Sequence, residues 1–285
     1  MKSEPDCIIC LFQQALNTAR AVSADPEIQL RILKRMAECV ATISLDQTPA
    51  RLSQAVYRIV SELTGNPDPY ARQKQETNRL ALALVPTIRA VITEAADPLE
   101  AALHAAVAGN IIDLGIGQAF DITKDILELM RRPFAVTALE AFRKELGAGR
   151  RLLILGDNAG EIVFDSLLVE QVLKTGAEVT YTVKSGPVIN DAMMADAVMV
   201  GMTRLVPVIE TGADDIGVDW DNVSVEFLRA VKRADIILGK GHGNFETCHH
   251  RPGNYYFLLK AKCEMVAHAI GCRLGDLVFT SGKSR

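Results

Sequence analysis

The chain has 285 residues, 49% of them hydrophobic and 23% charged, which is enough for one α/β unit with a helical extension or for two packed domains. A formal charge of −4 and the lack of a basic run argue against nucleic acid as a partner. We find no secretory leader and no stretch of about 18 apolar residues, so we expect a soluble, cytoplasmic protein that does not span a membrane.

The first half has the periodicity of helices. Apolar residues recur there at three- and four-residue steps. The breaker Gly65-Asn66-Pro67 follows the third periodic segment, and Pro86 lies inside the fourth, where a proline can bend a helix. We expect helices over residues 7–21, 26–43, 48–64, 69–95, 98–108 and 123–146.

The second half alternates short apolar runs with helical segments. The expected strands are residues 151–157, 178–184, 206–210, 235–240, 255–262 and 276–280, and the expected helices between them are 161–174, 191–200 and 222–233. Such alternation is typical of an α/β fold with a doubly wound, largely parallel sheet. We place a boundary near residue 147, between a helical domain (1–147) and an α/β domain (148–285).

Small and polar residues follow the first four predicted strands. The segments are GDNAGE (156–161), SGPVIND (185–191), ETGADD (210–215) and KGHGNFE (240–246). Because ligands of open α/β sheets bind beyond the carboxyl ends of the strands, we expect these four loops to meet at one edge and to form the functional site.

The side chains of these loops suggest a metal centre. Asp157, Asn158 and Asp191 offer the oxygen ligands that Mg²⁺ and Mn²⁺ prefer. Glycines such as Gly160 let backbone amides approach an anion at a helix N-terminus, and Lys240 offers a point charge for phosphate. A metal beside an anion site indicates phosphoryl transfer to water.

Simpler interpretations exist for each residue. Asp157-Asn158 alone fits a strand-to-helix turn equally well. We interpret His242 as a loop histidine and Asp165 as a solvated or capping residue of a helix, and residues 214–221 as an acidic surface stretch. The chain has no P-loop motif, and the first strand is not followed by the glycine pattern of a dinucleotide-binding fold.

Several blocks together resemble the damage-control metabolite phosphatases, a metal-dependent family long known as domain of unknown function eighty-nine. The blocks are AGNIIDLG (108–115), GDNAGEIVFD (156–165), KSGPVINDA (184–192), KGHGNFE (240–246) and LLKAKCEMVA (258–267). They run in order over nearly the whole chain. The early Cys7-x-x-Cys10 is similar to the prokaryotic branch of this family.

The resemblance implies a helical N-terminal part and a Rossmann-like three-layer α/β/α part. It also implies a divalent metal (Mn²⁺, Mg²⁺, Co²⁺ or Ni²⁺) held by Asp157, Asn158 and Asp191. Asp157, Asp191 and Lys240 become the expected catalytic residues, with Lys240 in the block that contacts phosphate. Residues at motif positions expected to bind substrate are Asn110, Asp113, Gly160, Glu161, Lys184, Asn244 and Glu246.

The substrates implied are sugar phosphates or damaged and surplus phosphorylated cofactors and precursors. The attacking group is either a water that the metal activates or Asp157 itself, and the residues do not separate the two. An S-adenosylmethionine-dependent carboxyl methyltransferase and a non-catalytic metabolite-binding protein are the rival functions. The oligomeric state cannot be deduced from the sequence.

The six cysteines suggest reduced thiols in a reducing compartment. Cys7 and Cys10 could bind a metal only with two further ligands, and Cys248, His249 and His250 are candidates if the fold joins the two ends of the chain. Packing of small thiols is the simpler interpretation.

Overall fold

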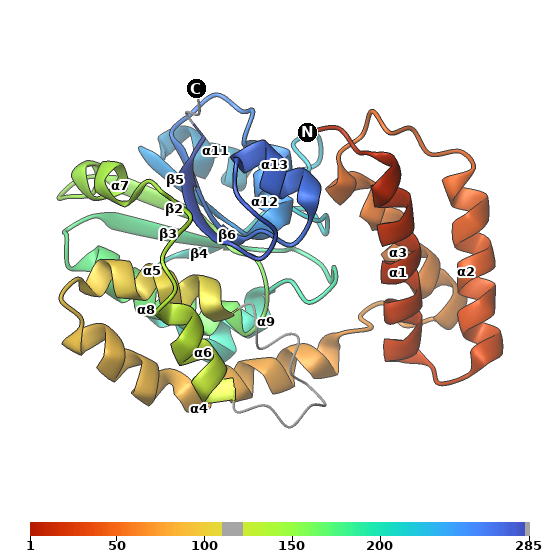
Figure 1. The fold of residues 1–285 in the computed structure, drawn as a ribbon, viewed down its shortest axis with the longest axis horizontal. Coiled ribbons are helices and arrows are strands. Elements are labelled where there is room, and N and C mark those ends of the chain that lie inside the picture. Colours follow the sequence, from red (N-terminus) through yellow and green to blue (C-terminus); the bar gives the residue numbers. More distant parts are fainter. Residues whose placement is uncertain (110–121, 283–285) are drawn as a thin grey trace.

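The structure, a computed structural model, describes residues 1–109 and 122–282 (Figure 1). Its first half contains α1 (Pro5–Val22), α2 (Pro26–Val40), α3 (Pro49–Thr64), α4 (Ala71–Glu94), α5 (Pro98–Ala108) and α6 (Ile122–Met130). Asp25, Thr48 and Asp97 cap helices whose first residue is proline, and each side chain accepts a backbone N–H of the first turn. The five helices predicted before residue 109 are present.

The second half forms a seven-stranded sheet in the order β1-β7-β6-β5-β2-β3-β4. The strands are β1 (Val136–Thr137), β2 (Arg151–Leu155), β3 (Glu178–Val183), β4 (Val208–Glu210), β5 (Ile236–Lys240), β6 (Tyr255–Lys260) and β7 (Leu277–Ser281). Every pairing is parallel except that of β6 with β7. The predicted α/β fold with a largely parallel sheet is confirmed.

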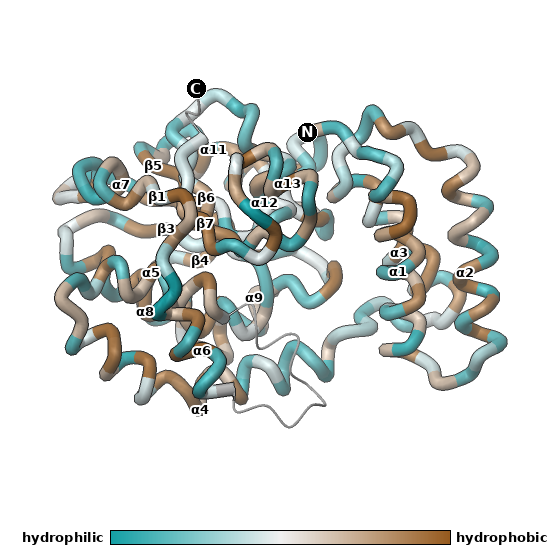
Figure 2. Tube along the Cα trace, in the orientation of Figure 1, coloured by the Kyte–Doolittle hydropathy of each residue, from teal (hydrophilic) through white to brown (hydrophobic). Residues whose placement is uncertain are grey.

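Helices cover both faces of this sheet. They are α7 (Leu139–Glu145), α8 (Glu161–Leu173), α9 (Met194–Val200), α10 (Met202–Leu205), α11 (Val225–Arg233), α12 (Gly241–Cys248) and α13 (Glu264–Ile270). Alternate residues of a strand point to opposite faces, so Leu152 and Ile154 join the core under α4, α5 and α8, whereas Leu153 and Leu155 join the core under α11–α13. Figure 2 shows the strands as the apolar centre between these layers.

Helices α1–α3 have a hydrophobic cluster of their own. It is built on Leu11, Ile32, Met36, Val56 and Val60, and it shares none of its buried members with the sheet. Helices α4 to α7 instead contribute to the cluster that packs on the sheet. The change from one hydrophobic cluster to the other lies between α3 and α4. The domain boundary near residue 147 stays a prediction.

Two local expectations were wrong. The helix predicted over 123–146 is divided into α6, β1 and α7, because Pro133 interrupts it and Val136–Thr137 pair with β7. The short helices α10, α12 and α13 were not predicted. All six cysteines are unbridged thiols. In the described part of the chain, no helix combines the length and apolar character that crossing a bilayer requires.

Candidate metal centre and active site

Two loops meet beyond the ends of β2 and β3. Asn158 forms an isolated β-bridge with Asp191, and the N–H of Ala192 donates to the Asp157 carbonyl at 2.8 Å. Gly156 permits this turn, since a Cβ there would lie 2.5 Å from the Thr182 carbonyl oxygen. The structure therefore brings the three predicted metal ligands together from loops more than 30 residues apart in the sequence.

The carboxylates of this crevice are only partly compensated by neighbouring cations. Asp191 is 3% exposed, and its Oδ2 has no hydrogen-bond partner among the described residues. The nearest cation is Lys184, whose Nζ lies 3.5 Å from that oxygen. Burial raises the pKa of Asp191 to about 6 even though Lys184 lowers it. Burial, and then the charges of Asp191 and Glu161, raise the pKa of Asp157 well above its usual range.

Lys240 is placed differently from the role we expected. Its side chain is fully buried, and its Nζ donates to Asp165 (2.7 Å), Glu161 (3.2 Å) and the Ala106 carbonyl (3.0 Å). Burial lowers the pKa of Lys240, but the charges of Asp165 and Glu161 outweigh it and raise the pKa above its usual value. In this structure the Lys240 ammonium therefore neutralises carboxylates of the chain itself.

Asp165 was wrongly expected to be a solvated or capping residue. It is fully buried, and its second oxygen accepts a hydrogen bond from the Tyr181 hydroxyl at 2.7 Å. Glu161 lies one turn earlier on the same face of α8 and accepts from the Asn158 amide at 2.8 Å. A continuous chain of contacts thus joins the sheet to one predicted metal ligand.

A small recess adjoins Asp157 at the start of α12. Gly241 has φ 72°, and a Cβ at this position would lie 1.9 Å from Oδ2 of Asp157. The recess is lined by Glu161, Gly241, His242, Lys260 and Lys262 together with apolar residues, and Asp157 lies behind Gly241 and not in the lining. Lys262 is exposed and has no ion-pair partner within the described residues. Its charge lowers the pKa of Asp157, although burial has the larger effect and raises it. An unpaired cation and a helix N-terminus favour an anion here.

His242 contributes no base to this recess. Its Nε2 lies 2.9 Å from the backbone N of Lys262 and 2.9 Å from the Lys260 carbonyl. Burial, and then the charge of Lys262, lower the pKa of His242 to about 4. The imidazole is therefore neutral near pH 7, in keeping with its interpretation as a loop histidine that holds the backbone.

Two residues expected to bind substrate hold backbone groups instead. The Asn244 amide donates to the carbonyls of Leu155, Gly156 and Lys240, so it ties the ends of β2 and β5 together. Glu246 accepts the Ala50 N–H of α3 at 2.9 Å and connects α12 to the helical part. These contacts explain the buried positions of both side chains.

Gly160 and Lys184 are buried beside the predicted metal ligands, and their role in substrate binding stays a prediction. A Cβ at Gly160 would lie 2.4 Å from Cγ2 of Thr77, so only glycine lets α4 approach this loop. The Lys184 ammonium donates to the Gly217 carbonyl and faces Asp191. Asn110 and Asp113, also expected to bind substrate, lie outside the described residues.

The helical part supplies residues that the sequence analysis missed. Asn78 of α4 accepts the Gly160 N–H at 2.7 Å and donates to Asp196 at 2.7 Å. Lys74, 3% exposed, pairs with Asp68 at 2.8 Å, and its charge lowers the pKa of Asp191 although burial dominates. One signal was available, because Lys74 and Asn78 lie four residues apart on the stripe of α4 that faces the core.

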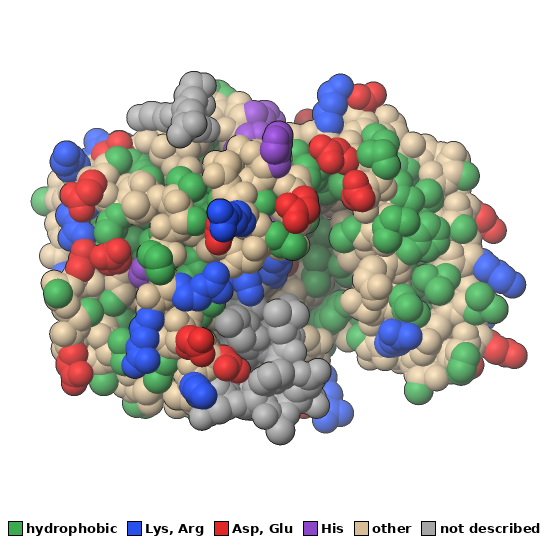
Figure 3. Space-filling model, viewed as in Figure 1, with side chains coloured by type: hydrophobic (Ala, Val, Ile, Leu, Met, Phe, Trp, Pro, Cys, Tyr) green, Lys and Arg blue, Asp and Glu red, His purple; other side chains and the backbone are tan. Residues whose placement is uncertain are grey.

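Tyr57 of α3 also lies near the crevice. Burial, and then the charges of Tyr70 and Asp191, raise the pKa of Tyr57 well above its usual value. Figure 3 shows the surface hollowed between the α1–α3 side and the sheet side, with Lys and Arg side chains along one edge. The crevice is therefore bordered by both halves of the chain.

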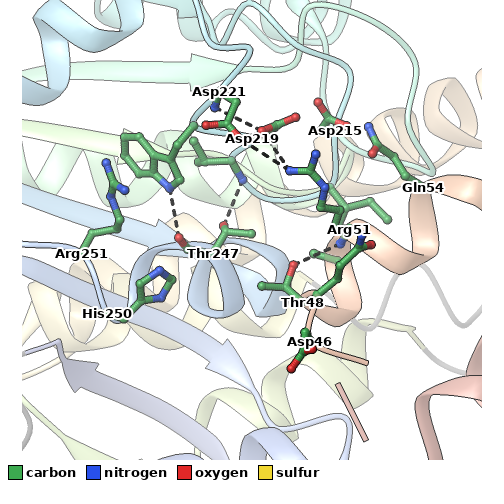
Figure 4. A pocket seen from close by; sticks show the side chains of 15 residues that line it. Asp46, Thr48, Arg51, Gln54, Asp215, Asp219, Asp221, Thr247, His250 and Arg251 are labelled. Carbon is green, nitrogen blue, oxygen red and sulfur yellow. Dashed lines mark hydrogen bonds and ion pairs between the residues drawn. The ribbon is translucent and has the colours of Figure 1, made fainter. Parts of the chain in front are cut away.

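A second hollow, of about 320 Å³, lies between α3 and the loop before α11 (Figure 4). There Arg51 lies 3.6 Å from Asp219 and 3.7 Å from Asp221, and Arg251 lies 4.4 Å from the centre of the Trp220 ring. Arg51 and Arg251 therefore have partners, whereas Oδ1 of the buried Asp215 in this lining has no hydrogen-bond partner among the described residues. None of the predicted metal ligands lines this hollow. The chemistry is therefore better supported at the strand ends.

No group of three or more His, Cys, Asp or Glu side chains in the described residues could hold a metal ion. The predicted ligand set contains only two such side chains, Asp157 and Asp191, with Asn158 as the third, so it is not such a group. A second site built from Cys7 and Cys10 with Cys248, His249 and His250 finds no support. Cys248 is fully buried, and burial raises the pKa of its thiol to about 12.

Comparison with known proteins extends the likeness to the whole chain. The family model described as "Damage-control phosphatase ARMT1-like domain" matches residues 3–278. An uncharacterized protein of Methanocaldococcus jannaschii is 31% identical over 98% of this chain and 95% of its own length. A damage-control phosphatase of Pyrococcus horikoshii is 30% identical over 99% of both chains. The crystal structure of a DUF89 family protein from Pyrococcus horikoshii covers 99% of this chain and 100% of its own, with a TM-score of 0.90 and 30% identity.

Proposed function

We propose a function from the premise that this chain belongs to the damage-control phosphatase ARMT1-like family, in which the Pyrococcus horikoshii relative is named a damage-control phosphatase. The chain is accordingly a phosphatase of small phosphorylated metabolites. We further infer that its activity depends on a divalent metal, that Asp157, Asn158 and Asp191 hold this metal, and that the substrates are sugar phosphates or damaged and surplus phosphorylated cofactors and precursors.

The observation that carries the metal proposal is the state of Asp191. Oδ2 of the buried Asp191 has no hydrogen-bond partner among the described residues, and only the Lys184 ammonium, at 3.5 Å, offsets its charge. Together with the half-buried Asp157 and the Asn158 amide beside it, this oxygen suits a hard cation such as Mn²⁺, Mg²⁺, Co²⁺ or Ni²⁺. When bound, such an ion polarises a phosphoryl oxygen and lowers the pKa of water. The donor set therefore fits the group that the family implies.

Other residues of the chain would bind the phosphate and orient the metal ligands. Lys262 and the N-terminus of α12 lie beside Asp157 and would bind the transferred phosphate through charge and backbone N–H groups. Lys184 would keep Asp191 oriented through their contact. Lys240, expected to contact phosphate, is assigned here to Glu161 and Asp165 instead. Either water or Asp157 would attack the phosphorus in line.

Phosphate release from a panel of sugar phosphates and phosphorylated cofactors tests the proposal. The apoprotein should be inactive after treatment with a chelator and should regain activity with Mn²⁺ or Co²⁺. We expect Asp191→Ala to lower kcat/KM about 100-fold or more, since it removes a ligand, and Lys262→Ala chiefly to raise KM. Asp221→Ala, whose side chain is 83% exposed, is the control. Full activity in chelator, or in Asp191→Ala, would exclude this metal site.

A further inference from the structure

A buried polar network leads from the middle of the sheet to Asn158. Its members are Tyr181 of β3, Asp165 and Glu161 of α8, and Lys240 at the end of β5, each at most 2% exposed. Strands β5, β2 and β3 are neighbours, so Lys240 and Tyr181 flank β2 beneath the first turns of α8. Three of its members lie in sequence blocks that resemble the family, Glu161 and Asp165 in 156–165 and Lys240 in 240–246. None of the four is a proposed metal ligand.

The contacts run in one direct sequence. The Tyr181 hydroxyl donates to one oxygen of Asp165 at 2.7 Å, and the other oxygen accepts from Lys240 at 2.7 Å. Lys240 then donates to Oε2 of Glu161 at 3.2 Å, and Oε1 of Glu161 accepts from Nδ2 of Asn158 at 2.8 Å. Each carboxylate is thus held at both of its oxygens.

These contacts fix the orientation of the Asn158 amide. Nδ2 of Asn158 faces two carboxylates, Glu161 at 2.8 Å and Asp157 at 3.3 Å. Glu161 is held as a hydrogen-bond acceptor by the Lys240 ammonium, so the group of Asn158 directed at Glu161 is the NH₂ and not the carbonyl. The carbonyl oxygen of Asn158 is thereby directed away from Glu161 and left for another partner.

Stability alone does not account for the network. Two buried carboxylates share one lysine, and replacing such a buried ion cluster with apolar residues is often neutral or stabilising. An apolar core would serve the sheet as well, since Ile154, Ile162 and Phe164 of the same elements are fully buried in the hydrophobic cluster that packs on the sheet. The ordered geometry suggests a role in the neighbouring site.

We propose that Asp165 and Tyr181 are positioning residues of the metal centre: they fix Lys240, Lys240 fixes Glu161, and Glu161 turns the carbonyl oxygen of Asn158 toward the ion. This inference rests on the proposed function, because it assigns a role to residues that touch neither metal nor substrate. Residues that hold a metal ligand through hydrogen bonds orient that ligand, and their loss commonly weakens metal affinity about 10- to 100-fold.

Calorimetric titration of Mn²⁺ into the chelator-treated full-length protein tests it. Tyr181→Phe removes only the hydroxyl, and Asp165→Asn removes the charge with little change of shape. We expect Kd for Mn²⁺ to rise about tenfold in each. Tyr255→Phe is the control, since Tyr255 is also buried (2% exposed, against 0% for Tyr181) but lies outside the network. Its Kd should equal that of the wild type. Melting temperatures of the apoproteins report whether each variant is folded, and Tyr181→Phe decides the matter if Asp165→Asn does not fold.

A double-mutant cycle with Asn158→Ala separates positioning from general destabilisation. If Tyr181 acts through the Asn158 amide, Tyr181→Phe should leave Kd unchanged once that amide is absent. Wild-type Kd in both network variants, or an equal loss in the Asn158→Ala background, would overturn the network inference and leave the metal proposal standing. Absence of Mn²⁺ binding by the wild type would overturn both.

Discussion

At the scale of single residues, Gly241 decides how Asp157 is placed. Its φ of 72° suits glycine, and a Cβ there would lie 1.9 Å from Oδ2 of Asp157, so Gly241→Ala must displace the carboxylate. Gly271→Ala is a matched control, because Gly271 has φ 83° but open space around a Cβ. Both variants should lose about 1 kcal/mol of stability from backbone strain.

The two variants should differ in activity. We expect kcat/KM of Gly241→Ala to fall at least about 100-fold, since small displacements in an active site are that costly, whereas Gly271→Ala keeps wild-type kcat/KM. Phosphate release and thermal melting on the same preparations measure both effects. Equal activity of the two variants would mean that Asp157 tolerates displacement and is not a ligand.

The sequence could predict which residues gather in the crevice but not what each one contacts. Asp157, Asn158 and Asp191 follow strand ends, and the topology of a parallel sheet brings strand ends together, so their meeting follows from the pattern. Lys240 is also at a strand end. Whether its ammonium meets phosphate or Asp165 depends on the packing of α8 against the sheet, which no local pattern contains.

At the scale of elements, the contact between α12 and α3 should make stability depend on pH. Burial raises the pKa of Glu246 from 4.5 to about 7. The hydrogen bond from the Ala50 N–H and the charge of the N-terminal amine lower it by less. The thiols of Cys7 and Cys263 also face this carboxylate. Between about pH 4.5 and 7 the folded protein keeps a proton that the unfolded chain has released. This contribution to stability is therefore full below pH 4.5 and is lost as pH rises through 7.

Glu246→Gln removes this titration while an oxygen remains to accept from Ala50. The variant should gain stability relative to the wild type as pH rises from 4.5 to 8, by on the order of 1–3 kcal/mol at pH 8. Urea denaturation across this range measures the difference. Glu226→Gln, on the exposed surface of α11, controls for the loss of a charge. A difference that stays constant or shrinks with pH would show that Glu246 is ionised in the fold at low pH.

Elements that form through distant partners could not be predicted from local pattern. The two-residue β1 exists because β7 pairs with it, although the two are more than 130 residues apart. Helix α12 begins Gly241-His242-Gly243, a sequence of low helix propensity, and its Asn244 is fixed by carbonyls of β2 and β5. Long helices that begin with proline after a capping residue, such as α2 and α3, could be predicted from their own sequence alone.

At the scale of the whole molecule, the crevice lies where two differently packed parts meet. Helices α1–α3 have their own cluster, and α4 continues from them onto α8, where Asn78 holds Gly160. Tyr57 and Lys74 reach the neighbourhood of Asp191 from this side. A motion of α1–α3 would therefore change access to the crevice, whereas the proposed metal ligands, which lie in the loops after β2 and β3, would stay in place.

Because α1–α3 have a hydrophobic cluster separate from that of the sheet, we expect these helices to unfold locally while the sheet stays folded. Ile32 is fully buried in the α1–α3 cluster, so Ile32→Ala should cost about 2–5 kcal/mol of local stability. Hydrogen exchange should then show faster exchange in α1–α3 and unchanged protection in β2, β3 and β5, because parts with separate cores open separately. Ile236→Ala, which empties a fully buried position of β5, is the counterpart and should weaken protection across the sheet. An equal loss of protection in α1–α3 and the sheet in Ile32→Ala would show instead that the chain opens as one cooperative unit and that α1–α3 does not move independently over the crevice.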